Sequence, residues 1–72
     1  MKAVATKSAP AAVGPYSQAI DCGDTVYLSG QIPLVPETGL IVEGGIEEQS
    51  RRMFKNIEAV LAEAGLSFKN VV

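Results

Sequence analysis

The stretch that decides the fold is AIDCGDTVYLS, which runs from Ala19 to Ser29. Residues 19–22 alternate apolar with polar or small side chains, and residues 25–29 are rich in the β-branched and aromatic types that suit a half-buried strand. Gly23 and Asp24 separate the two runs, and glycine takes the positive φ that a tight hairpin turn needs. We therefore predict an antiparallel β-hairpin.

Alternation along a strand assigns the hairpin side chains to two faces. Val26 and Leu28 are expected on one face and Tyr27 on the other, where Tyr27 packs on the sheet or at a contact between subunits. Cys22 is the only cysteine, so no intrachain disulfide can form. Because a buried free cysteine behaves as a small hydrophobic residue, we expect Cys22 in the core.

Two segments that flank the hairpin form a candidate site: GPYSQ, residues 14–18, and LSGQIP, residues 28–33. Pro15 restricts its own φ and the conformation of the residue before it, so Tyr16 lies on a stiff loop. Ser29 leaves the second strand where Gly30 ends it. The hairpin brings the loop tyrosine and the serine-glycine pair together, and we predict a small-molecule site between them.

A helical period follows in residues 46–64, where an inward stripe recurs every three or four residues: Ile46, Ser50, Met53, Ile57, Val60, Leu61 and Ala64. Such a stripe covers a sheet. Gly65 occupies the position at which a left-handed residue closes a helix, with Leu66 folding back onto Leu61.

Two ion pairs are expected in the first turns of this helix. Glu47 and Glu48 favour the positive end of the helix dipole and lie four residues before Arg51 and Arg52. Solvated ion pairs explain both arginines, and we give them no role in a site.

The remaining segments are less distinctive. Residues 2–5 alternate weakly and predict a short strand, and residues 40–42 are either a short strand or an apolar loop packed on a neighbour. Residues 67–70 read as a connection, and Val71 and Val72 as the start of another strand. A domain that ended there would leave an open sheet edge, so we expect residues 1–72 to be part of a longer domain.

Composition limits the function classes. A chain of 72 residues forms one small domain, and its 47% hydrophobic residues argue against disorder. It has no long apolar run and no segment like a signal peptide, so we expect no membrane partner and a cytoplasmic protein. The absence of histidine argues against a metal site. A net charge of −2 with only six Lys and Arg argues against nucleic acid as a partner.

Residues 9–18, APAAVGPYSQ, and residues 29–33, SGQIP, are followed by a helix that contains Gln49 and Asn56. At this spacing the chain resembles, nearly end to end, the amino-terminal half of the RidA reactive-intermediate deaminases, also known as translation inhibitors or L-PSP endoribonucleases. The resemblance implies an α+β, chorismate-mutase-like fold with a mainly antiparallel sheet covered by helices. Residues 1–72 would form about its first half, a hairpin plus one helix.

The resemblance also implies an activity. RidA proteins hydrolyse enamines and imines such as 2-aminoacrylate to a 2-keto acid and ammonium, without a cofactor, in homotrimers whose sites lie between subunits. The implied substrate-binding residues are Tyr16, Ser29, Gly30, Gln31 and Ile32. The arginine that holds the substrate carboxylate and the glutamate that handles water belong to the second half of the family domain. We therefore expect no catalytic residue in residues 1–72, which alone would be inactive.

Each of these residues also has an ordinary structural explanation. Tyr16 can be an amphipathic loop aromatic, and Gly30 can simply end a strand. Ser29 has no histidine to accept its proton, so we assign it a binding role rather than that of a nucleophile. Two other functions stay open: a non-catalytic member that senses a ligand or binds a protein, and the RNA-cleaving role.

Overall fold

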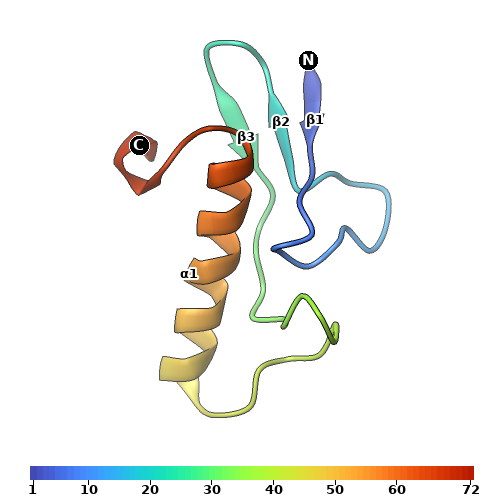
Figure 1. Cartoon of the computed structure of the whole chain (residues 1–72), viewed down its shortest axis with the longest axis vertical. Coiled ribbons are helices and arrows are strands. Elements are labelled where there is room, and N and C mark those ends of the chain that lie inside the picture. The colour runs from blue at the N-terminus through green and yellow to red at the C-terminus, as the bar shows by residue number, and fades with distance from the viewer.

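Three short strands form an antiparallel sheet at one end of the molecule (Figure 1). The computed structural model describes the whole chain, residues 1–72. The strands are β1 (Lys2–Val4), β2 (Ala19–Asp21) and β3 (Val26–Leu28), in the spatial order β1-β2-β3. Ile20 in the central strand lies between Ala3 and Tyr27. The predicted hairpin is confirmed, with strands slightly shorter than expected.

The hairpin turn forms as the residue types predict. The Cys22 amide donates to the Thr25 carbonyl oxygen at 2.8 Å, and the Gly23 amide donates to Asp21 Oδ1, also at 2.8 Å. Gly23 has φ +95°, a conformation that side chains disfavour. Cys22, however, is only half-buried and lies outside the core, so that expectation was wrong. The hairpin tip extends past the end of the helix and is not covered by it (Figure 1).

One long helix, α1 (Ile46–Glu63), lies beside the sheet, and the segment that leaves β3 runs along it (Figure 1). At its start the Gly45 amide donates to Glu48 Oε2 at 2.9 Å. At its end Gly65 has φ +77°, and the Leu66 amide donates to the Leu61 carbonyl oxygen at 2.8 Å. This is the Schellman closure that the sequence predicts. The chain has no helix with the length and apolar character that a membrane span requires.

Only one of the two predicted ion pairs forms. Arg51 Nη2 lies 2.7 Å from Glu47 Oε1, and both side chains are largely exposed. The expected pair between Glu48 and Arg52 was wrong, because the Glu48 carboxylate accepts from the helix amino terminus instead. Arg52 turns toward Asn56 and donates to its Oδ1.

The apolar core between sheet and helix is small. Its buried cluster consists of Val4, Ala9, Ala19 and Val60, and Val26 and Leu28 of β3 pack against it. Tyr27 lies on the other face of β3, as the alternation predicts, but its side chain is 66% exposed and no part of the chain covers it. The predicted helix stripe is buried or half-buried from Ser50 to Ala64. Ile46 was wrongly included, since it is 79% exposed in the first turn, where no sheet lies opposite it.

The segments at residues 40–42 and 67–72 form no regular strand. Residues 40–42 make only an isolated bridge between Leu34 and Ile41, with the Val42 amide donating to the Pro33 carbonyl oxygen at 2.9 Å. Residues 67–70 include a single turn of 3₁₀ helix, Phe68–Asn70. Val71 and Val72 form no strand, contrary to expectation, because their backbone has no neighbouring strand to pair with.

Gln18 attaches the loop after β1 to the start of β2. Its side chain is 4% exposed, and Nε2 donates to the carbonyl oxygens of Thr6 and Pro10 at 3.1 and 2.7 Å. Its Oε1 accepts from the Thr6 amide at 2.7 Å. A single carboxamide thus bonds part-buried backbone groups of the loop that no strand pairs.

We expect the substitution Gln18→Leu to lower the free energy of unfolding by about 1–3 kcal/mol, because it leaves the loop's backbone groups buried without partners. Urea denaturation of the protein measures this. Gln49→Leu is the matched control, since the Gln49 side chain is half-buried and makes no hydrogen bond. Equal stability of the two variants would contradict the role of Gln18.

Gly65→Ala should cost about 1 kcal/mol of stability, because alanine is strained at the left-handed position that closes α1. Gly30→Ala is the comparison: its φ lies outside that region, and an added Cβ meets no atom within 4 Å. Thermal unfolding should give the lower melting temperature for Gly65→Ala, by about 2–8 °C, the range that 1 kcal/mol produces in domains of 60–250 residues. The same melting temperature for both would refute the strain argument.

Candidate functional site

A pocket of about 340 Å³ lies between the loop that precedes β2 and the segment that follows β3. The loop contributes Tyr16, and the opposite wall contributes Gly30, Gln31 and Ile32. The structure therefore brings together four of the five predicted binding residues. We call this space the Tyr16 pocket.

Ser29 lies on the other side of that wall. It lines a separate groove of about 740 Å³ between β3 and the carboxyl-terminal half of α1, and Gly30 and Gln31 border both spaces. Its hydroxyl donates to the Ser17 carbonyl oxygen at 2.5 Å, and its amide donates to the Gln18 carbonyl oxygen at 3.0 Å. In this chain the Ser29 side chain joins the loop to the strand end, which is a supporting contact for the Tyr16 pocket.

The Tyr16 loop is built from local hydrogen bonds. Gly14 has φ +135°, and the Tyr16 amide donates to the Gly14 carbonyl oxygen at 2.9 Å. The Tyr16 hydroxyl oxygen accepts from the Val13 amide at 3.4 Å, while half of the side chain remains exposed. The hydroxyl is therefore only weakly held and can reorient toward a ligand.

Backbone donors line the opposite wall. The amides of Gly30, Gln31 and Ile32 donate to no other group of the protein, while the Gln31 side chain donates to the Ser29 carbonyl oxygen at 3.2 Å. Free backbone N–H groups bind acceptor oxygens of a ligand, such as those of a carboxylate or a carbonyl group. Because none of the residues lining the Tyr16 pocket is Asp, Glu, Lys or Arg, this wall can hold a ligand but offers little for proton transfer.

Asn56 is a supporting residue that sequence reasoning missed. Its side chain is completely buried, and Nδ2 donates to the carbonyl oxygens of Ile32 and Leu34, each at 3.0 Å. Both of these residues line the Tyr16 pocket. Asn56 lies three residues after Met53 and four before Val60, so helical periodicity places it on the inward stripe. A polar residue at such a position indicates a buried side chain that needs hydrogen-bond partners.

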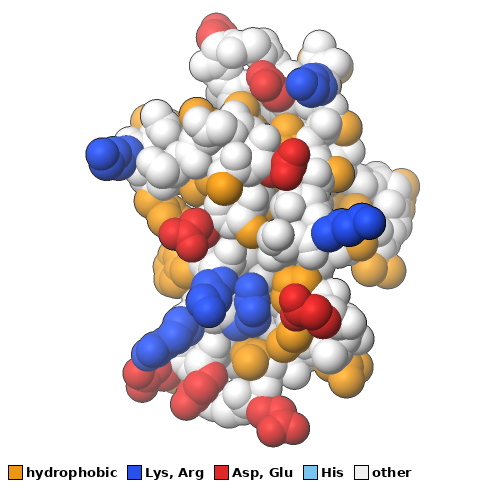
Figure 2. Space-filling view, in the orientation of Figure 1, with side chains coloured by type: hydrophobic (Ala, Val, Ile, Leu, Met, Phe, Trp, Pro, Cys, Tyr) orange, Lys and Arg blue, Asp and Glu red, His pale blue; other side chains and the backbone are white.

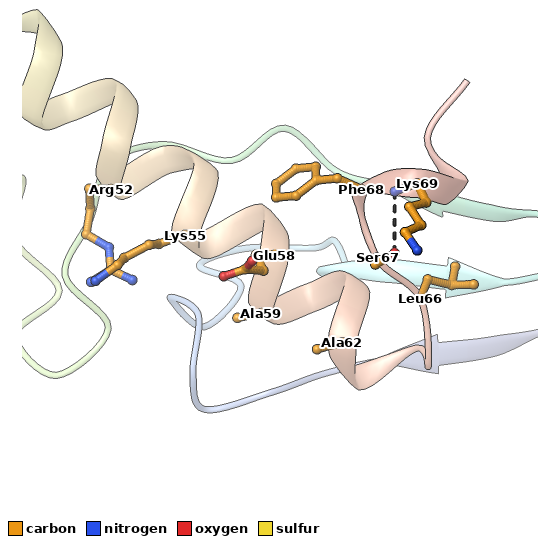
Figure 3. Close-up of a pocket in the computed structure, with 9 residues that line it drawn as sticks. All are labelled: Arg52, Lys55, Glu58, Ala59, Ala62, Leu66, Ser67, Phe68 and Lys69. Atoms are coloured by element: carbon orange, nitrogen blue, oxygen red, sulfur yellow. Dashed lines mark hydrogen bonds between the residues drawn. The ribbon is translucent and has the colours of Figure 1, made fainter.

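A third space, an open cleft of about 700 Å³, lies on the outer side of α1 and holds none of the predicted binding residues (Figure 3). Its cationic side chains are Arg52, Lys55 and Lys69, with Glu58 as the carboxylate. Figure 2 shows Lys and Arg side chains gathered on this part of the surface. We call this feature the outer cleft.

The profile of the family described as Endoribonuclease L-PSP matches residues 6–72. A RutC family protein from Pyrococcus abyssi is 54% identical over 67 residues, covering 93% of this chain and 53% of that protein. The 2-iminobutanoate/2-iminopropanoate deaminase of Mus musculus is 46% identical over 71 residues, covering 99% of this chain and 53% of the mouse protein.

Among solved structures, E. coli TdcF with bound serine is 43% identical, with a TM-score of 0.89 over 94% of this chain and 53% of that chain. The chain thus spans about half the length of the relatives it matches. The α+β fold expected from the resemblance is confirmed by this superposition. The family profile covers nearly all of the sequence, and this chain therefore belongs to the RidA (Endoribonuclease L-PSP) family.

Proposed function

We propose that residues 1–72 are the amino-terminal part of a hydrolase that converts reactive enamines and imines, such as 2-aminoacrylate, to a 2-keto acid and ammonium. The observation that carries this proposal is the Tyr16 pocket, whose free Gly30, Gln31 and Ile32 amides suit a small ligand with acceptor oxygens. The deaminase name of the mouse relative supports the reaction class. The serine bound to TdcF supports a ligand of that size.

The proposed hydrolysis requires few chemical groups from the residues that line the Tyr16 pocket. The carbon of a protonated imine is already electrophilic, so attack by water, followed by loss of ammonia, gives the keto acid without a cofactor. The protein must hold the substrate, position the water and exclude competing nucleophiles. In our proposal Tyr16 and the backbone amides hold and orient the substrate.

The remaining functions require other residues. No charged side chain lines the Tyr16 pocket, so we propose that an arginine and a glutamate from sequence outside residues 1–72 bind the carboxylate and handle the water. We also propose that the complete protein is a cytoplasmic homotrimer with sites between subunits. Residues 1–72 alone are then inactive.

The complete protein should accelerate keto-acid formation from 2-aminoacrylate generated in situ, and the spontaneous reaction without protein gives the background rate. Tyr16→Phe should lower kcat/KM by about two- to tenfold, since it removes one hydrogen-bonding hydroxyl from the pocket. Tyr27→Phe makes the same change on the exposed face of β3 and serves as the control.

The absence of acceleration by the complete protein would refute the deaminase proposal. If the protein binds 2-keto acids without accelerating hydrolysis, the non-catalytic, ligand-sensing alternative replaces it. If kcat/KM falls equally in the Tyr16→Phe and Tyr27→Phe variants, the Tyr16 hydroxyl has no specific role in binding, although the proposed reaction still stands.

A second candidate function is RNA cleavage, after which the matching family is named. The observation in its favour is the outer cleft, where Arg52 and Lys55 lie side by side and Lys69 lines the far end, although the chain as a whole has a net charge of −2 (Figure 3). Cationic side chains on one face are what phosphate binding requires. The chain holds no histidine to serve as a general base, which ranks this candidate second.

We expect rigorously repurified protein to leave a generic RNA intact. The measurement is the cleavage rate across successive purification steps, with the double variant Lys55→Glu, Lys69→Glu as the test of the outer cleft. The double variant Lys2→Glu, Lys7→Glu provides a control with the same change of charge outside the cleft. Cleavage that survives repurification and is lost only in the double variant would reverse the ranking.

A further inference from the structure

The Asn56 side chain is completely buried, and every one of its hydrogen-bonding groups has a partner within the protein. Nδ2 donates to the Ile32 and Leu34 carbonyl oxygens, each at 3.0 Å, and Oδ1 accepts from Arg52 Nε and Nη2 at 3.2 and 2.9 Å. A carboxamide offers two donor hydrogens and one acceptor oxygen. All of them are used, and all contacts beyond α1 go to the wall of the Tyr16 pocket.

We propose that Asn56, oriented by Arg52, is a positioning residue of the ligand pocket. It fixes the backbone of residues 32–34 and thereby the direction of the free amides of Gly30, Gln31 and Ile32. This inference rests on the proposed function, because it assigns Asn56 an effect on substrate binding. Asn56 itself does not line the pocket and acts only through the wall.

The wall has no other hydrogen bond to α1. Pro33 has no N–H, and its carbonyl oxygen accepts from Val42 on the opposite side. The Leu34 amide is used locally, donating to the Ile32 carbonyl oxygen at 2.8 Å. The two bonds from Asn56 therefore attach this segment to the helix. Without them, the wall is restrained mainly by its own turn.

Arg52 determines which way the carboxamide faces. Two donors from a guanidinium require an acceptor, so Oδ1 must face Arg52 and Nδ2 must face the two carbonyl oxygens. The Arg52 side chain reaches Asn56 from the surface of α1, where it lines the outer cleft (Figure 3). Since Arg52 has no ion pair, its interaction with Asn56 is not shared with a carboxylate.

The sharpest test is Asn56→Asp in the complete protein. The carboxylate still accepts from Arg52 but donates nothing, and it faces the Ile32 and Leu34 carbonyl oxygens with like partial charge. We expect KM for the imine to rise about five- to tenfold with kcat within about twofold, the pattern of binding lost equally from the ground state and the transition state. Gln49→Glu is the matched control, because it makes the same amide-to-carboxylate change on α1 where the side chain bonds nothing.

Arg52→Met provides a second variant that keeps the buried amide. We expect a smaller rise of KM in the same direction, and the double variant should show less than the sum of the two effects, because both act on one unit. Arg51→Met, which removes only the exposed pair with Glu47, should leave KM unchanged. Unchanged KM in both Asn56→Asp and Arg52→Met, or a loss of kcat at unchanged KM, would overturn the inference.

A readout independent of catalysis separates this inference from the proposed function. The amides of Leu34 and Val42 donate to the Ile32 and Pro33 carbonyl oxygens, and their hydrogen exchange should quicken in Asn56→Asp relative to the parent protein, while the exchange of β2 stays the same. Equal exchange of the Leu34 and Val42 amides in the two proteins overturns the positioning role. Absence of imine hydrolysis in the parent protein refutes the proposed function alone, because the exchange result then still decides whether Asn56 holds the wall.

Discussion

The hydrogen bonds from the Asn56 carboxamide to the Ile32 and Leu34 carbonyl oxygens join α1 to the segment that leaves β3. That segment runs along the helix without forming a strand beside it, so its backbone groups must find partners elsewhere (Figure 1). A completely buried amide, held by Arg52, supplies them. The position of one pocket wall relative to the helix depends on this contact.

Gln18 performs the same task on the opposite wall. Its buried carboxamide binds the backbone of the loop that follows β1, close to the residues that carry Tyr16. Only seven of the 72 residues are buried, so apolar packing contributes less here than in a larger domain. Two carboxamides, rather than a large core, therefore frame the Tyr16 pocket. Buried amides are directional, and this suits a site whose ligand contacts are mostly backbone groups.

Charge is separated from the pocket. The residues that line the Tyr16 pocket include no Lys, Arg, Asp or Glu, whereas Arg52 and Lys55 of α1 line the outer cleft. An uncharged wall preserves the strength of hydrogen bonds between backbone amides and a ligand oxygen, because few competing charges surround them. The division also explains how an acidic chain can present a basic surface on one side.

Local elements were predictable because their causes are local. The Gly23 turn, the alternation of Val26 to Leu28 and the Gly65 helix end each follow from a few neighbouring residues, and the motif around Tyr16 sufficed to identify the family. The half-buried Cys22, the missing Glu48–Arg52 pair and the absent strand at Val71 were decided by tertiary structure. The burial of a side chain depends on the segments that pack over it, and an ion pair or a strand forms only if no other group takes the same partner. Residues distant in the sequence decide both.

The Tyr16 pocket was predictable in part from local sequence, while the rest of it depends on contacts between distant residues. Sequence alone placed Tyr16, Gly30, Gln31 and Ile32 near one another, because a hairpin must bring its two flanking segments together. Only the fold turned Ser29 to the other side of the wall and revealed Asn56, 24 residues from Ile32, as its support. Hydrogen bonds across such separations leave no periodic signal in the sequence, since they form only once helix and sheet have packed.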